Sequence, residues 1–175
     1  MGVDQISKHD HSSEADGGED IAPTSVDTDR ITVNSEVLVD VLLTSDQSIS
    51  TATWVTIDFD QENNDVTDDY DIGKNHFSPP EDGHYRIELT ARFSAGTNSD
   101  TVGLRLVNIT DNDEERRFRS SAASAADFSV TFVVVKRLLS AKTYELQARN
   151  NSSSDVLEGA SGKSTYMTVS REEKA

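Results

Sequence analysis

The sequence contains no cysteine, which excludes disulfide bonds, thiol nucleophiles and zinc sites built from thiolates. It also lacks any apolar run that approaches the roughly 20 residues needed to cross a bilayer. Basic residues are scarce: the chain has 16 Lys and Arg but 32 Asp and Glu, so its formal net charge is -16. A surface of that sign repels phosphate groups, so we expect neither nucleic acid nor membrane insertion among its interactions.

The excess of acidic residues is spread along the whole chain of 175 residues. This pattern is typical of halophile proteins, in which high net charge keeps the protein soluble while molar salt shortens the Debye length to about 3 Å. An ordinary acidic protein from a mesophile is the alternative. Hydrophobic residues make up only 34% of the chain, which is enough for one core beneath a very polar surface.

The chain divides by composition into a leader, a head and a short tail. Residues 1–35 contain isolated apolar side chains such as Ile21 and Val26 between polar ones, too sparse to form a core. Such a segment is typical of an extended acidic stem whose isolated apolar side chains become buried when identical copies associate around an axis. A flexible leader is the alternative. We expect residues 36–170 to form the folded head and residues 171–175 a charged tail.

Apolar and polar side chains alternate from His84 to Phe93, which is the period of a half-buried strand. No segment shows a convincing helical stripe. About eight strands with short connections predict an all-β protein, and a jelly-roll sandwich of antiparallel strands is the commonest eight-stranded architecture. We expect this sandwich to carry an extended N-terminal stem. Further strands are expected at residues 37–43, 54–59, 102–106, 116–120, 128–137, 144–149 and 165–170.

Three segments resemble the jelly rolls of complement globular heads and tumour necrosis factors. The runs from Tyr70 to Gly73 and from Phe77 to Ile87 together resemble their central signature, in which a Phe, a Pro and a Gly-x-Tyr mark the turn into a long inner strand. The run from Leu138 to Leu146 resembles a later turn and strand, with Ala-Lys in place of the usual Gly-Asp, and residues 164–169 resemble the closing strand. The resemblance covers roughly residues 36–170 and implies a jelly-roll head.

The leader carries a second resemblance, in the run from His9 to Ser13, in Gly17-Gly18 and in Ile21-Ala22-Pro23. These motifs resemble linkers of tail-fibre and spike proteins of tailed viruses, where short polar segments connect an attachment end to a trimeric globular tip. Together with the jelly roll and the acidic surface, the resemblance implies a virion surface protein of a tailed virus that infects halophilic archaea.

His9 and His11 are candidate metal ligands. In an extended chain their imidazoles point to one side, so three copies around an axis would supply six nitrogens for an octahedral transition metal. Tail-fibre proteins that the leader resembles use His-x-His in this way. A solvated pair is the alternative, so a structural metal ion stays open and no cofactor is certain.

Two acidic segments, residues 58–69 and 111–115, offer the oxygen ligands that calcium needs. The first does not fit a helix-loop-helix calcium site, because Asn63 replaces the required Gly and Asp69 replaces the bidentate Glu. A looser calcium or sodium site in either segment and a solvated acidic surface are the two remaining interpretations.

The strand expected at residues 128–137 bears on assembly. Its alternation places Val133 and Val135 opposite the core, and exposed β-branched side chains on an acidic protein favour burial against another subunit. Trp54 and Tyr166 also point outward by alternation and are candidates for the same oligomer interface. Cover by a loop of the same chain is the alternative.

No Gly-x-Ser-x-Gly or similar nucleophile turn is present, and acidic pairs arise by chance in a chain so rich in them. We therefore expect a virion structural protein and no enzyme: a homotrimeric tail-fibre tip that attaches to a host surface glycan or protein. Other virion proteins would hold it through its N-terminal stem. A capsid turret or decoration protein with the same fold is the alternative, and a cellular secreted binding module is a weaker one.

The halophile interpretation predicts a salt-dependent stability. The midpoint of thermal unfolding should rise steadily between about 0.1 M and several molar salt, first because charge repulsion is screened and then because apolar burial is strengthened. Differential scanning calorimetry over that range measures it. Equal midpoints at both ends would indicate an ordinary acidic domain.

Overall fold

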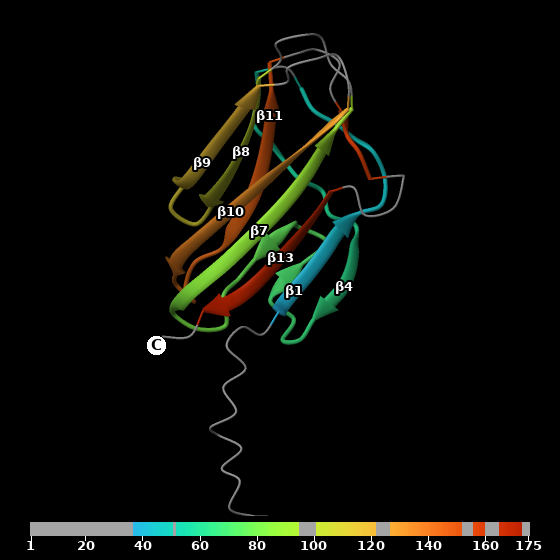
Figure 1. Ribbon diagram of the computed structural model, residues 1–175. Coiled ribbons are helices and arrows are strands. Elements are labelled where there is room, and N and C mark those ends of the chain that lie inside the picture. The colour runs from blue at the N-terminus through green and yellow to red at the C-terminus, as the bar shows by residue number, and fades with distance from the viewer. Residues whose placement is uncertain are drawn as a thin grey trace, which may run out of the picture. The chain divides into compact units, whose positions relative to one another are not determined.

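Every regular element is a strand in the part of the chain that the computed structural model describes, which is residues 37–50, 52–94, 101–121, 127–151, 156–159 and 165–172 (Figure 1). All of these residues belong to one compact unit, Asn34–Ala175. The strands are β1 (Val37–Leu43), β2 (Gln47–Ser48), β3 (Val55–Thr56), β4 (Gln61–Asp65), β5 (Tyr70–Asp71), β6 (His76–Phe77), β7 (Gly83–Phe93), β8 (Thr101–Asn108), β9 (Asp113–Ser121), β10 (Phe128–Leu138), β11 (Tyr144–Asn150), β12 (Val156–Leu157) and β13 (Thr165–Glu172).

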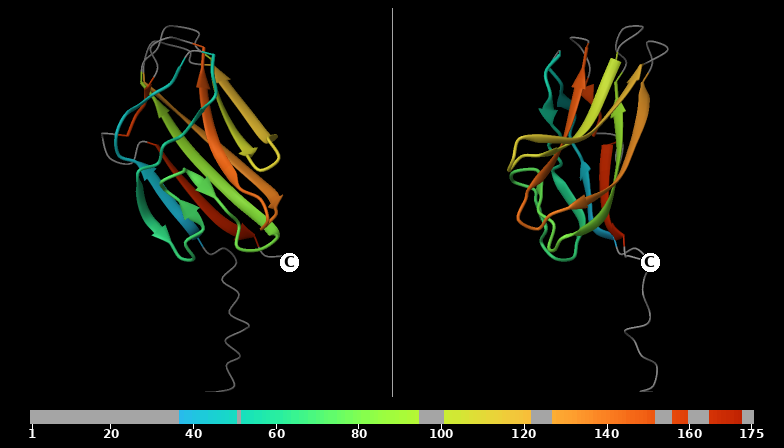
Figure 2. Two further views of the ribbon diagram at one scale, coloured as in Figure 1. Left: turned by 180° about the vertical axis from the view of Figure 1, so that it is seen from behind. Right: turned by 90° about the vertical axis from the view of Figure 1, so that its left-hand side faces the viewer.

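The strands form two sheets that lie one behind the other (Figure 2). Sheet A has the order β2-β12-β7-β13-β1-β4, with β10 also paired to β7. Sheet B has the order β5-β6-β11-β8-β9, with β3 also paired to β11. Every pairing is antiparallel, and most neighbours in a sheet are distant in sequence, so the chain crosses repeatedly between the two layers.

Alternation along the long strands builds the core between the sheets. In sheet A, Leu89 of β7 lies opposite Phe132 of β10 on one side and Met167 of β13 on the other. All three side chains are buried, as are Leu104 and Leu146 of sheet B. Because each strand turns one face inward, removal of these apolar side chains from water stabilises the sandwich.

The predicted strands are observed, with different lengths in places. The expected strand at residues 54–59 is only two residues long, and the strand expected to begin at Arg116 begins at Asp113. Side-chain alternation does not predict β4, because its residues are polar and almost all exposed; the strand forms at the sheet edge by pairing with β1. The all-β sandwich of antiparallel strands is confirmed.

Candidate functional site

The outer face of sheet A carries two exposed valines on β10. Val133 is 44% exposed and Val135 is 54% exposed, whereas Val130, Phe132 and Val134 on the same strand are buried. The predicted alternation of β10 is therefore confirmed. Both valines therefore point away from the core, on the side of sheet A that faces away from sheet B.

Tyr166 lies on the same outer face, two strands away from β10. It is opposite Thr90 of β7 and Leu42 of β1, and Thr90 is in turn opposite Thr131 of β10. Beside Tyr166 the surface has a hollow of about 310 Å³, which Leu42 and Asp40 also line. Val133, Val135 and Tyr166 thus share one face, which we call the sheet A face.

Trp54 does not belong to the sheet A face, which corrects the expectation that it shares a surface with Tyr166. It precedes β3, which pairs with β11 of sheet B, and its ring lies over Arg105 of β8. Alternation correctly places both aromatic rings outward, but they point outward from opposite sheets. The four residues predicted for one interface therefore cannot form a single surface.

Gly103 makes room for the Trp54 ring on the outer face of sheet B. A Cβ atom at Gly103 would lie 2.8 Å from Cη2 of Trp54, closer than non-bonded carbon atoms approach. The strand neighbours Val102 and Leu104 are buried, so a larger residue at Gly103 would displace the ring rather than turn inward. A glycine inside a strand often marks such a close approach, and this signal was present in the sequence.

Arginine side chains surround the Trp54 ring. The guanidinium carbons of Arg105, Arg117 and Arg149 lie 4.4, 5.4 and 6.0 Å from the ring centroid. These distances are within the range of cation–π attraction. Local sequence does not reveal this cluster, because its arginines come from β8, β9 and β11 and meet only through the pairing of those strands.

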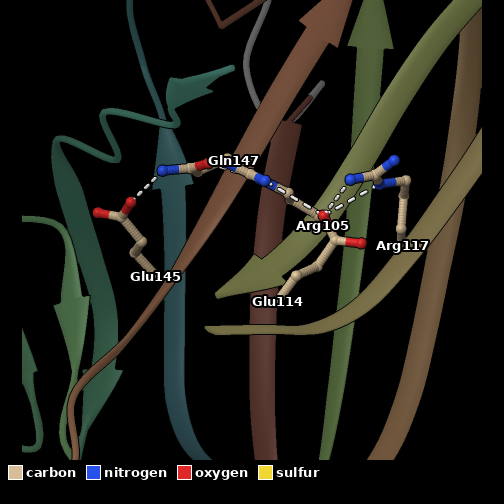
Figure 3. Close-up of polar contacts among 5 residues, drawn as sticks. All are labelled: Arg105, Glu114, Arg117, Glu145 and Gln147. Atoms are coloured by element: carbon tan, nitrogen blue, oxygen red, sulfur yellow. Dashed lines mark hydrogen bonds and ion pairs between the residues drawn. The ribbon is translucent and has the colours of Figure 1, made fainter. Parts of the chain in front are cut away.

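A chain of hydrogen bonds fixes part of this cluster (Figure 3). Arg105 donates from Nε to Gln147 at 2.7 Å and from Nη1 to Glu114 at 3.1 Å, and Arg117 donates from Nε to the same Glu114 oxygen at 3.0 Å. Gln147 donates in turn to Glu145. Partial burial raises the pKa of Glu114, but the hydrogen bonds and charges of Arg117 and Arg105 outweigh that effect and hold its pKa below the usual range.

A cavity of about 130 Å³ opens beside the Trp54 ring. Its polar lining consists of Thr101, Arg119, Arg149 and Asn151. Within the described residues, neither Arg119 nor Arg149 has an ion-pair partner, and Nε of Arg149 is buried without a hydrogen bond. The cavity therefore combines an aromatic ring with two uncompensated guanidinium groups.

The metal candidates have different outcomes. His9 and His11 lie outside the described residues. In the two acidic segments, carboxylates bind protein donors, as in the contact of Asp60 with the backbone N–H of Thr44 at 2.6 Å and that of Asp111 with Lys142 at 2.6 Å. Across the described ranges, no group of three or more His, Asp or Glu side chains is placed to hold a metal ion.

The remaining histidines lie on different sheets. His76 of β6 has its Nε2 3.6 Å from Oε2 of Glu145, and the same carboxylate oxygen accepts a hydrogen bond from Thr56 at 3.2 Å. His84 lies exposed near the start of β7, as its alternation predicts. Glu145 is thus held by structural contacts of sheet B.

No protein-family model matches the sequence, and no curated protein matches it. Solved structures do match. The globular domain of zebrafish complement 1qA protein superposes with a TM-score of 0.55 at 13% identity, covering 80% of this chain and 100% of that one. The tumour necrosis factor Eiger of S. frugiperda gives a TM-score of 0.57 at 11% identity over 78% of this chain and 92% of that one. Murine APRIL gives a TM-score of 0.56 at 12% identity, covering 78% of this chain and 98% of that one.

These comparisons establish the fold of the head. Its strands have the jelly-roll arrangement of complement 1q and tumour necrosis factor domains, so the predicted jelly roll is confirmed. At such low identities the likeness carries no statement about function. In the described residues, no helix is long and apolar enough to span a membrane.

We predict that Gly103→Val will displace the Trp54 ring from its site between the arginines. The chain contains a single tryptophan, so its fluorescence emission reports on this ring alone. Emission should shift to longer wavelength because the ring becomes more exposed to water. The control is Gly73→Ala, whose Cβ atom would meet Asp71 at 3.3 Å, and it should leave the spectrum unchanged. An unshifted spectrum for Gly103→Val would contradict the packing of the ring on Gly103.

Proposed function

We propose that the chain is a non-enzymatic virion structural protein whose jelly-roll head forms a homotrimer and attaches the particle to a host cell surface. The observation that carries the self-association is the exposed apolar side of β10, where Val133 and Val135 are about half exposed. Burial of one half-exposed valine contributes roughly 1 kcal/mol, and each subunit supplies both. The occupant of the sheet A face is therefore a second copy of this chain.

The edge of β10 supports the same conclusion. β10 spans Phe128–Leu138, pairs along its length with β7, and has no second ladder partner in the described part of the chain. A long edge strand with apolar side chains is prone to uncontrolled association unless it is covered. An ordered contact with another subunit would supply that cover.

Charge on the sheet A face favours contact between copies of an acidic chain. Arg86 and Glu88 of β7 pair at 3.2 Å, and Arg92 pairs with Glu158 at 2.5 Å and with Asp127 at 3.4 Å. These pairs leave the face nearly neutral although the whole chain has a formal charge of -16. Two copies that approach through this face avoid most of the repulsion that other orientations would meet.

Three copies and a virion location are supported by the leader. Its motifs resemble linkers of tail fibres with trimeric tips, so residues 1–35 would dock to other virion proteins while the head faces the medium. The same features suit a capsid turret or decoration protein, which is the second candidate. The two differ in one respect that the isolated protein can report, namely whether the head binds host cells.

The first test removes the apolar contact. Val133→Glu combined with Val135→Glu should convert a trimer into monomers and raise the dissociation constant by at least about a hundredfold, because the new carboxylates would be buried without partners. Multi-angle light scattering of the full chain at high salt measures the mass. The control is Val66→Glu, which changes a valine of 55% exposure located after β4, at the other edge of sheet A.

The control protein should remain trimeric. A wild-type chain that is already monomeric, or a double variant that stays trimeric, would refute the assigned interface. Circular dichroism of each variant shows whether the strands are retained.

The second test separates stem from head. Deletion of residues 1–30 should leave a folded trimeric head that no longer joins virions, since the leader carries the docking segment. For a tail-fibre tip, the truncated head should still bind host cells in a flow-cytometry assay. A head that incorporates into virions at full copy number would contradict the docking role of the stem, and a head without cell binding would favour capsid decoration.

A further inference from the structure

The cavity beside Trp54 is large enough for one sugar-sized ring. Its volume is about 130 Å³. An enclosed cavity of about 150 Å³ accepts a benzene ring, so a single six-membered ring can enter this more open one. The cavity lies on the outer face of sheet B, whereas the valines of the sheet A face lie on the other sheet. One subunit therefore contains the whole site.

Charge in this cavity is opposite to that of the rest of the protein. Arg105 and Arg117 share the carboxylate of Glu114, so that pair of guanidinium groups is partly neutralised. Arg119 and Arg149 have no such partner in the described residues, although the chain has twice as many acidic as basic side chains. A planar guanidinium pairs with a carboxylate through two parallel hydrogen bonds, so the guanidinium groups of Arg119 and Arg149 favour a carboxylate ligand.

A buried donor atom of Arg149 is a second reason to expect a ligand with a hydrogen-bond acceptor in this cavity. Its Nε is buried and has no hydrogen-bond partner in the described part of the chain. Buried donors are rarely left without a partner in folded proteins. An anionic ligand beside Arg149 would provide a charge-assisted contact to a group that the protein itself leaves incompletely satisfied.

The remaining lining matches the other parts of an acidic sugar. The indole of Trp54 offers a negatively polarised face to the C–H groups of a pyranose ring. Thr101 and Asn151 offer a hydroxyl and an amide for sugar hydroxyl groups, and the Asn151 N–H donates to the Thr101 carbonyl at 3.1 Å, which ties these two residues together. The hydrogen bonds of Arg105 to Gln147 and Glu114 hold the arginine nearest the ring in place before a ligand arrives (Figure 3).

We propose that the cavity lined by Trp54, Arg119 and Arg149 binds a uronic acid residue, a sugar with a single carboxylate. This inference rests on the proposed function in naming the chemistry of the host surface glycan that the head would recognise. A single charge is favoured over a polyanion, because a chain of formal charge -16 repels a long anionic polymer outside this small site. The carboxylate pairs with the two arginines while the ring packs on the indole.

The test titrates the full-length protein with glucuronate, glucose and acetate, read out by emission of its single tryptophan and by calorimetry. Glucuronate should bind saturably and at least about tenfold more tightly than glucose, which lacks the carboxylate, and than acetate, which lacks the ring. Arg119→Gln and Arg149→Gln should each weaken glucuronate binding by about tenfold or more.

The matched control is Arg116→Gln, which removes an arginine from the same strand, β9, outside the cavity lining. It should leave glucuronate affinity unchanged. Equal affinities for glucuronate and glucose, or an equal loss in Arg116→Gln, would overturn the proposal, as would the absence of saturable binding. Because these titrations need neither virions nor cells, such a failure would leave the trimer and attachment tests to be decided on their own results.

A glycan array distinguishes a uronic acid carried by a surface glycan from a free sugar acid as the ligand. Binding to immobilised glycans with a terminal uronic acid, lost in Arg149→Gln, supports recognition of a surface glycan. Binding of free glucuronate with no signal on such glycans would overturn the link to a host glycan and leave a site for the free sugar acid.

Discussion

Alternation of side chains along the long strands is the constraint on which both candidate surfaces depend. In β10 the inward positions are taken by Phe132 and its buried neighbours, so the valines between them must face outward. A shift of β10 by one residue against β7 would exchange the two sets and bury Val133 in place of Phe132. The alternation that fills the core with Phe132 and its neighbours therefore also places the valines on the sheet A face.

The two sheets use arginine in different ways. On the sheet A face, Arg86 and Arg92 are matched by nearby carboxylates, which makes the face nearly neutral and suited to contact with another copy. On sheet B, Arg119 and Arg149 have no ion-pair partner among the described residues and line a small positive site on an acidic protein. One surface is thus suited to self-association and the other to an anionic ligand.

Most of the fold could be predicted from the sequence, because the period of two in β7, β10 and β13 is strong and their core positions are apolar. The strand β4 could not, since Gln61–Asp65 is polar throughout and becomes a strand only by pairing with β1. Alternation placed Trp54 and Tyr166 outward, but it does not say from which sheet a residue points. The arginine cluster depends on the register of β8 against β9 and β11, which local sequence does not encode.

The polar edge strand β4 has a consequence for how far assembly can proceed. Sheet A ends at β4, where four of five residues are exposed and Glu62 and Asp65 add negative charge. Strand-to-strand extension at this edge would bring the carboxylates of one chain against an incoming backbone, which disfavours pairing. Copies can therefore close around a symmetry axis through β10 without also growing into open-ended fibrils. The contrast between the apolar edge at β10 and the charged edge at β4 thus favours a small closed oligomer of the head over open-ended growth.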